Sequence, residues 1–285
     1  MVLEAATVRS SLEKRADVNA LHFHLHAASV LAPGLTTLAQ LRAICRSNQA
    51  ATFTEVLQLP PPEMLPANEH RRASQVVRLT QACIQQVLES SPFPVESLRS
   101  VFATDEGTGE VCQQVLQAVT TRRRVSPLLF SNSLQNAPSG YFSISWHNRQ
   151  SSTVVSLGLE SFASGLLCAV TEAISCQQPV LLVAYDPPMA PPMDELLSIR
   201  EATATAWIIS GGAENADAPV LSSFALELEN AGSHAPSAWP AWLPTRWSTH
   251  SSASGFAALG LLEAPVQTSY RMTYGTQILC LRRSG

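Results

Sequence analysis

The chain has 285 residues, a length that fits one large α/β domain or two smaller ones. With 46% hydrophobic and 14% charged residues, the composition predicts a folded core and excludes general disorder. The net charge of −4 and the pI near 6.0 argue against a nucleic-acid-binding protein. No continuous apolar run approaches the roughly 18 residues of a membrane span, so none is predicted.

Residues 1–20 are charged and lack an apolar signal core, so we expect a loose leader rather than a secretion signal. The six cysteines are scattered without a C-x-x-C pair: Cys45, Cys83, Cys112, Cys168, Cys176 and Cys280. Most of them lie in apolar patterns, which is typical of reduced, buried thiols. These features together indicate a cytoplasmic protein with its folded part at residues 21–285.

Hydrophobic spacing predicts alternating strands and helices in the first half of the chain. Strands are expected at 21–34, which ends at a Pro-Gly turn, and at 97–104. Helices are expected at 36–48, at 71–90 and from 109 onward. In the last of these helices, Val111, Val115 and Val119 are expected to face inward. Two segments are predicted to be irregular, the proline-rich 56–69 and the amide- and serine-rich 126–146.

The second half contains the most apolar segments. Strands are predicted at 152–160 and at 179–186, the latter buried on both faces because it is continuously apolar. The helix at 161–175 is apolar on nearly every side and is therefore expected to be sandwiched between layers. Segments 204–210 and 219–229 are predicted to pair antiparallel, 230–255 to be a loop, and 269–283 to form a hairpin. This order predicts a layered α/β/α architecture.

Two motifs have simple structural interpretations. Gly107 and Gly109 lie between a strand and a helix, as in a dinucleotide-binding loop, but the downstream acidic strand end is absent. We therefore assign these glycines to a turn. His22, His24 and His26 share one face of the first strand, but neighbouring imidazoles there are roughly 6–7 Å apart, too far for one tetrahedral metal ion. No metal site is predicted.

The segment 158–165 has the layout of a nucleophile elbow, a strand followed by a tight turn and a buried helix. Such a turn presents one side chain at the helix N-terminus, where amide dipoles stabilise a thiolate or an oxyanion. The residue at that place is Phe162, which has no nucleophilic atom. Ser161, Ser164 and Cys168 lie nearby, and their simplest interpretation is capping, packing and core.

Two surface features remain open. Arg122, Arg123 and Arg124 end a predicted helix, where they either form a solvated helix end or dock an acidic protein. Trp239, Trp242 and Trp247 lie in the predicted loop, where they fit either a small satellite core or an interface.

The segment VVSLGLESFASGLLCAVTEAI resembles the active-site junction of β-ketoacyl synthases, usually written T-A-C-A-S-G and followed by a helix. Ala163, Ser164 and Gly165 match the trailing A-S-G, and Phe162 falls at the nucleophilic cysteine. The segment from Arg124 to Gly140 is similar to the S-P-x-x-F-S-x-S-x-H-N-A-x-x-G pattern of a short ketosynthase-like branch found beside aryl polyene pathways. The likeness covers roughly residues 21–228.

The resemblance implies a reduced thiolase-like fold, with much of the usual C-terminal half missing from a single domain at 21–285. Two residues depart from the family pattern. Gln135 replaces a histidine, and Phe162 replaces the cysteine whose thiolate attacks an acyl thioester. His250 remains, in a segment faintly similar to a family histidine motif. Without the thiolate, condensation is not expected, so the chain resembles a chain-length factor, the inactive partner in a ketosynthase heterodimer.

This resemblance also implies partners and site residues. The expected partners are a complete ketosynthase and an acyl carrier protein, with no cofactor, metal or nucleic acid. Carrier docking is expected at Arg122, Arg123 and Arg124. Candidate residues of the acyl tunnel or the subunit boundary are Glu106, Val111, Cys112, Val115, Leu134 and Gln135.

Two alternatives stay open at this point. The chain could act alone as an acyltransferase or malonyl-carrier-protein decarboxylase, using Ser161, Ser164 or Cys168 or only a polarising pocket. It could also be a homodimeric scaffold without an acyl tunnel. Product length, starter unit and the identity of the carrier protein cannot be deduced from the sequence.

Overall fold

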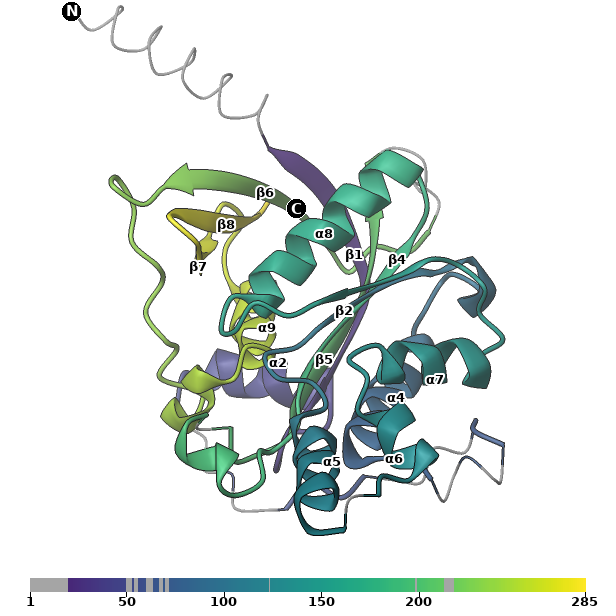
Figure 1. Cartoon of the computed structure of the whole chain (residues 1–285). Coiled ribbons are helices and arrows are strands. Elements are labelled where there is room, and N and C mark those ends of the chain that lie inside the picture. Colours follow the sequence, from purple (N-terminus) through teal and green to yellow (C-terminus); the bar gives the residue numbers. More distant parts are fainter. Residues whose placement is uncertain are drawn as a thin grey trace, which may run out of the picture.

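The structure is a computed structural model in which an eight-stranded sheet organises the chain (Figure 1). It describes residues 20–49, 53, 56–59, 64–66, 69, 72–122, 124–197, 199–212 and 218–285. The expected leader at 1–20 lies almost wholly outside these residues, as does much of the proline-rich segment. The strands, in their order across the sheet, are β3 (Ser152–Val155), β2 (Arg99–Ala103), β4 (Val180–Asp186), β5 (Thr203–Gly211), β1 (Leu21–Leu31), β6 (Ser222–Asn230), β8 (Gln277–Arg283) and β7 (Ser269–Tyr274).

The middle of the sheet corrects one predicted strand pairing. Segments 204–210 and 219–229 form β5 and β6, but β1 lies between them and pairs antiparallel with both. β1 suits this central place because it has 11 residues and is buried along most of its length. Its partners are almost 200 residues away in sequence, so local patterning could not reveal them. β4 is buried at every position, as predicted from its continuous apolar run.

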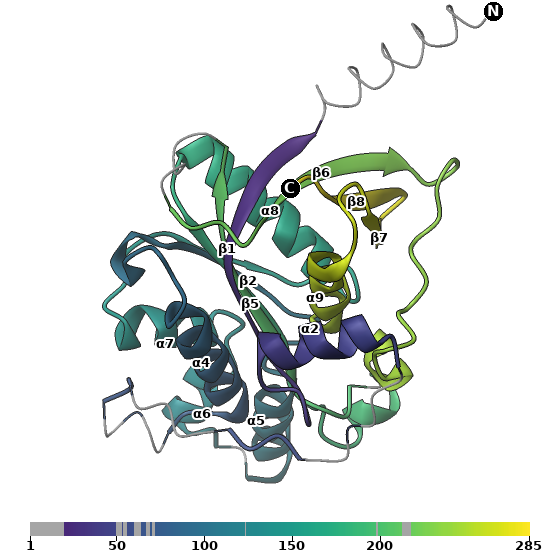
Figure 2. The ribbon, with the colours of Figure 1, turned by 180° about the vertical axis from the view of Figure 1, so that it is seen from behind.

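Helices cover both faces of the sheet, which confirms the layered α/β/α prediction (Figures 1 and 2). On one face, α4 (Gln75–Leu88) and α7 (Ala137–Ser145) pack on an apolar cluster, with α5 (Gly109–Arg122) and α6 (Pro127–Asn132) farther out. The other face carries α2 (Leu38–Ser47), α8 (Ser161–Cys176) and α9 (Ala253–Leu259). Short 3₁₀ turns connect these elements at Val95–Ser97, Met193–Glu195, Thr245–Thr249 and Gly260–Glu263.

The prediction that 126–146 is irregular is wrong, because this segment forms α6 and α7. Ser126 caps α6 by accepting a hydrogen bond from the Leu129 amide at 3.1 Å, and Pro127 occupies the first helical position. Pro138 lies similarly in the first turn of α7. The serines and prolines that suggested a loop are therefore helix-start signals.

Three further expectations need correction. Val119 does not face inward but is 49% exposed, because α5 belongs to the outer layer. The strand expected at 152–160 ends at Val155, and Gly158 takes a positive φ of 60° in the turn that follows. The segment 230–255 is not all loop, since it ends in the 3₁₀ turn at Thr245–Thr249 and the start of α9.

The tryptophans of the 230–255 segment belong to the core rather than to an exposed patch. Trp247 is fully buried, stacks on Phe53 with 5.0 Å between ring centroids, and meets Phe256 edge-on. Trp242 is buried and Trp239 is partly buried against the same apolar cluster. These rings help to cover the face on which α8 and α9 lie.

Helix α8 is sandwiched over its first half only. Residues 161–166 are buried between the sheet and α9. The later turns bury one face only, since Ala169, Val170 and Ala173 are buried whereas Thr171, Ser175 and Cys176 are exposed. By length and composition the segment Gly158–Cys176 could cross a membrane, which corrects the expectation that no apolar segment approaches that length. Half of this segment is buried inside the fold, which is typical of a core helix.

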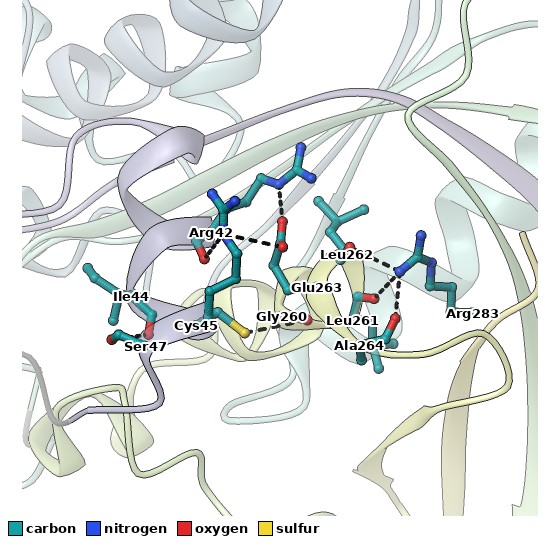
Figure 3. Close-up of polar contacts among 11 residues, drawn as sticks. Arg42, Ile44, Cys45, Ser47, Gly260, Leu261, Leu262, Glu263, Ala264 and Arg283 are labelled. Atoms are coloured by element: carbon teal, nitrogen blue, oxygen red, sulfur yellow. Dashed lines mark hydrogen bonds and ion pairs between the residues drawn. The ribbon is translucent and has the colours of Figure 1, made fainter.

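Ion pairs and backbone contacts join the two ends of the described chain (Figure 3). Arg42 and Arg46 on α2 both pair with Glu263 in the 3₁₀ turn after α9. From β8, Arg283 donates to the carbonyl oxygens of Leu261, Leu262 and Ala264. Helix α2 and strand β8 are thus both attached to the segment 260–264 that follows α9. The division of the chain into a leader and one domain with a reduced C-terminal half stays a prediction.

All six cysteines are free, but only two of them are buried. Cys83 and Cys280 are buried, Cys45 and Cys168 are half-buried, and Cys112 and Cys176 are exposed. The expectation of mostly buried thiols is therefore wrong for the exposed pair.

Candidate functional site

The candidate site lies where the carboxyl ends of β2 and β4 meet the N-terminus of α8. Phe162, the second residue of α8, is fully buried, and its ring meets Trp207 edge-on with 5.4 Å between centroids. Gly255 of α9 closes over the same ring, since a Cβ atom there would lie 2.9 Å from Phe162 Cε2. The aromatic ring therefore fills the space behind the helix N-terminus.

The backbone amide at this position is also occupied. The Phe162 N–H donates to Ser251 Oγ at 2.7 Å, and both residues are buried. A helix N-terminus stabilises an oxyanion only through amides that are free to donate to it. Ser251 thus takes up a donor that an acyl-transfer site would direct at its substrate.

A buried polar network surrounds this junction and is centred on Asp186. Its Oδ1 accepts the Asp105 amide at 2.9 Å, and its Oδ2 accepts the Ser252 amide at 2.6 Å. Ser252 Oγ lies 2.7 Å from Thr203 Oγ1, which lies 3.1 Å from Nδ1 of His250. The network connects the ends of β2, β4 and β5 to the segment before α9.

His250 is a neutral member of this network. Burial lowers the pKa of its imidazole, and the nearby carboxylates of Asp186 and Glu201 only partly offset that effect. Its Nδ1 partner is the Thr203 hydroxyl, which itself contacts Ser252, so the ring is held by structural hydroxyls rather than by a nucleophile. Among the described residues, no thiol lies in the network of His250.

Asp105 is the acid of the site whose pKa departs from its ordinary value. Burial, the charge of Asp186 and the charge of Glu106 all raise the pKa of its carboxyl, from the ordinary value of 3.8 to about 6. Among the described residues, the Asp105 carboxylate forms no hydrogen bond and no ion pair. An acid of this kind is protonated in a mildly acidic solution and ionised near neutrality.

The three candidate nucleophiles have structural roles. Ser161 Oγ accepts the Leu157 amide at 2.8 Å and donates to the Gly158 carbonyl at 2.7 Å, which ties the turn to α8. Ser164 Oγ is buried without a partner among the described residues. Burial and then the charge of Glu172 raise the pKa of the Cys168 thiol. Among the described residues, none of the three hydrogen-bonds to a histidine.

The six tunnel candidates do not form one wall. Glu106 and Cys112 line an apolar cavity of about 570 Å³ between α5 and the 189–193 segment, together with Leu116, Met189 and Met193. Val111 lines a different cavity of about 410 Å³ toward α6. Val115 is half-buried, and Leu134 and Gln135 are exposed in the connection between α6 and α7. The structure therefore separates the candidates into three places.

The glycine and histidine motifs noted in the sequence make structural contacts. Gly107 has a φ of 55° and donates its amide to Thr104 Oγ1 at 2.9 Å, in line with a turn. His26 bonds the Pro219 carbonyl and the Ser210 hydroxyl, and His24 bonds the Ser223 hydroxyl. Within the described part of the chain, no three His, Cys, Asp or Glu side chains gather as a metal site would require.

The arginine run is described only in part. Helix α5 ends at Arg122, Arg124 is exposed, and Arg123 and the side chain of Arg122 lie outside the described residues.

An unpaired strand edge lies beside the site. β3 is the last strand on its side of the sheet, and it pairs in parallel with β2. The carbonyls of Ser151 and Val155 accept the amides of Ser100 and Thr104, each at 3.1 Å. Because successive residues of a strand face opposite sides, the backbone groups of Val154 are directed at the open edge. Such an edge is a template for pairing with another chain.

Sequence reasoning located Phe162 but missed Ser251, Asp105 and Asp186. One local signal was available, because Asp186 ends a continuously apolar strand and a charge there is unusual unless it is bonded. The bonds themselves join residues up to 89 positions apart and have no local signature.

Comparisons with known proteins identify the family and the fold of the chain. Residues 45–253 match the family model described as the β-ketoacyl synthase N-terminal domain. No curated protein matches the chain. Among solved structures, the chain is similar to one from the ketosynthase (ApeO) in complex with its chain length factor (ApeC) from Xenorhabdus doucetiae. That likeness has a TM-score of 0.69 and 20% identity over 92% of this chain and 100% of that chain.

Two other complexes share the fold. One contains a type II PKS acyl-carrier protein and its ketosynthase bound to the hexaketide, with a TM-score of 0.73 and 9% identity over 93% and 99% of the chains. The other is the ishigamide ketosynthase/chain length factor, with a TM-score of 0.68 and 14% identity over 92% and 99%. At these identities the three likenesses show a thiolase-like ketosynthase fold and nothing finer.

We expect Phe162→Cys to show no acyl transfer from an acyl thioester. The new thiol would be buried and would lack a histidine partner, and the amide beside it would still donate to Ser251. The lost ring should lower the free energy of unfolding by about 2–4 kcal/mol, measured by urea denaturation. Covalent acyl loading of this variant, detected by intact-protein mass spectrometry, would contradict the assignment of a plugged site.

Asp105 should make the stability of the free chain depend on pH. Its pKa is higher in the folded than in the unfolded chain, so its favourable contribution is present at low pH and is lost as pH rises through about 6. Between pH 4 and pH 7 this contribution should fall by about 1–2 kcal/mol, after allowance for solvent screening. Urea denaturation across this range measures the change, and Asp105→Asn should remove this component. An identical pH profile in the two proteins would refute it.

Proposed function

The chain belongs to the β-ketoacyl synthase family, and from that premise we propose that it is a non-catalytic, chain-length-factor-like subunit of a ketosynthase complex. Its proposed partners are a complete ketosynthase and an acyl carrier protein, in the cytoplasm, and its proposed pathway is aryl polyene or fatty-acid-like synthesis. Solved complexes of a ketosynthase with a chain length factor or a carrier protein share its fold and support this choice of partners.

The observation that carries the proposal is the state of the α8 N-terminus. Condensation requires a thiolate that attacks the acyl thioester and donors that stabilise the oxyanion. Here an aromatic ring occupies the nucleophile's place, and Ser251 binds the amide of Phe162. A chain that keeps the fold without this chemistry fits a role in shaping or supporting an active partner.

The β3 edge is the proposed contact surface for that partner. No described strand pairs with its outward backbone groups, and the turn that follows exposes Leu157 and Leu159. α5, α6 and the connection after them expose further large apolar side chains, among them Leu116, Phe130 and Leu134. Exposed apolar patches flanking an open strand edge are features of a surface that another protein covers.

The cavity between α5 and the 189–193 segment is the proposed acyl-binding part of the complex. Its lining includes the candidates Glu106 and Cys112, and the methionines beside them suit a flexible apolar chain. Val111 and Val115 then act through the packing of α5, and Leu134 and Gln135 lie on the proposed contact surface. Arg122, Arg123 and Arg124 remain the proposed docking point for the acidic carrier protein.

Co-production with a complete ketosynthase encoded nearby tests the proposal. We expect a 1:1 pair or its dimer by size-exclusion chromatography with light scattering, active only while the partner keeps its own cysteine. Val154→Pro should weaken the pair at least tenfold, because it removes an amide at the open edge. Val154→Ala, which keeps that amide, is the matched control.

Other outcomes would change the proposed function or the proposed contact surface. A self-contained homodimer that ignores the ketosynthase would favour a scaffold. Loss of malonyl-carrier protein with this chain alone would favour the decarboxylase alternative. Equal affinities for the proline and alanine variants would move the contact surface away from β3.

Cys112→Trp should shorten the product of the reconstituted pair. The larger side chain would fill part of the 570 Å³ cavity that Cys112 lines, so fewer extension cycles would fit. Val119→Trp is the control, because Val119 is exposed on the same helix and lies outside that cavity. Product masses from both variants measure the effect. Unchanged product length with Cys112→Trp would exclude this cavity as the acyl site.

A further inference from the structure

Asp105 is a buried acid that has no counter-charge among the described residues. The residue is only 7% exposed, and its two charged neighbours, Asp186 and Glu106, are also acidic. Asp186 is already bonded to two backbone amides, whereas the Asp105 carboxylate bonds nothing among the described residues. Burying an ionised carboxylate without a partner is costly, and folded proteins pair such groups.

The carboxylate lies just beneath a surface turn. A Cβ atom on Gly158 would lie 3.9 Å from Asp105 Oδ1, so the absence of a side chain there leaves the acid thinly covered. Leu157 and Leu159, which flank Gly158, are 57% and 58% exposed. Ser161 fixes the turn through bonds to the Leu157 amide and the Gly158 carbonyl. We call this surface, in which Leu157, Gly158 and Leu159 cover the Asp105 carboxylate, the Asp105 window.

This window continues the open edge of β3. The Ser156 hydroxyl, directly after β3, donates to the Asp105 carbonyl at 2.6 Å, and the Thr104 amide bonds Val155. A chain that pairs with β3 and continues past Val155 would reach the turn that carries Gly158. Interface hot spots lie in well-packed, desolvated pockets from which the surrounding contacts exclude water.

We infer that the partner subunit places a basic side chain, arginine or lysine, over Gly158 and against the Asp105 carboxylate. This inference rests on the proposed function, since the occupant is the ketosynthase that pairs with β3. Charge complementarity selects a cation, because a neutral apolar group there would leave the acid buried and unpaired. The leucines would exclude water from the pair.

Asp105→Asn is the decisive variant because it should act in opposite directions on the free chain and on the complex. The free chain should become more stable at pH 7.5, seen as a higher urea midpoint. The complex should become at least tenfold weaker by isothermal titration calorimetry with the purified ketosynthase. Glu89→Gln, which removes an exposed acid at the C-terminal end of α4, outside both the window and the proposed acyl cavity, is the matched control and should leave affinity within twofold.

A second measurement needs no variant. Because a bound cation favours ionised Asp105, the wild-type complex should tighten as pH rises from 5.5 to 7.5 and should release protons on forming. The groups facing Asp105, namely Asp186 and Glu106, and His250 beyond Asp186 are common to the wild type and to Asp105→Asn. A flat profile in the variant would therefore assign the dependence to Asp105.

The outcomes separate the two proposals. If the wild-type chain forms no complex with the ketosynthase, the proposed function fails. If that complex forms with equal affinity for wild type and Asp105→Asn and without pH dependence, only the basic-residue inference is overturned. Closure of the window by a second copy of this chain would overturn it as well.

Discussion

The bonds of Asp186 hold the candidate site together. One carboxylate accepts the backbone amide that follows β2 and the backbone amide that leads into α9, segments about 150 residues apart in sequence. Charge-assisted bonds to backbone amides are stronger than neutral ones, and they are protected here by complete burial. The positions of Ser251 beneath Phe162, of His250 against Thr203, and of Asp105 at the surface window all depend on this bridge.

Much of the fold could be predicted from the sequence, because its strongest signals are local. The continuous apolar run of β4, the apolar helix α8 and the hairpin turning at Gly275 follow from patterning over a few residues. The insertion of β1 between β5 and β6 could not be predicted, because strand pairing joins distant segments. α6 and α7 were missed because Ser126 and Pro127 suit a loop as well as a helix start.

The candidate site was predictable only at one point. Phe162 could be identified because a strand, a turn and an apolar helix indicate the junction between β3 and α8. The neighbouring Ala-Ser-Gly also matches a family motif. The bond from its amide to Ser251 and the exposure of the Asp105 window depend on tertiary packing. The helical spacing of α5 could not predict that Val111 and Cys112 line separate cavities. Residues from other parts of the chain form the remaining walls of both cavities.

The ring pair of Phe162 and Trp207 also gives the protein an internal optical reporter. Trp207 is fully buried, its indole N–H donates to Thr205 at 3.0 Å, and Phe162 borders its ring. An indole in such dry surroundings emits at shorter wavelength than one in water. Any event that admitted water behind the α8 N-terminus would therefore shift the emission of Trp207 to longer wavelength.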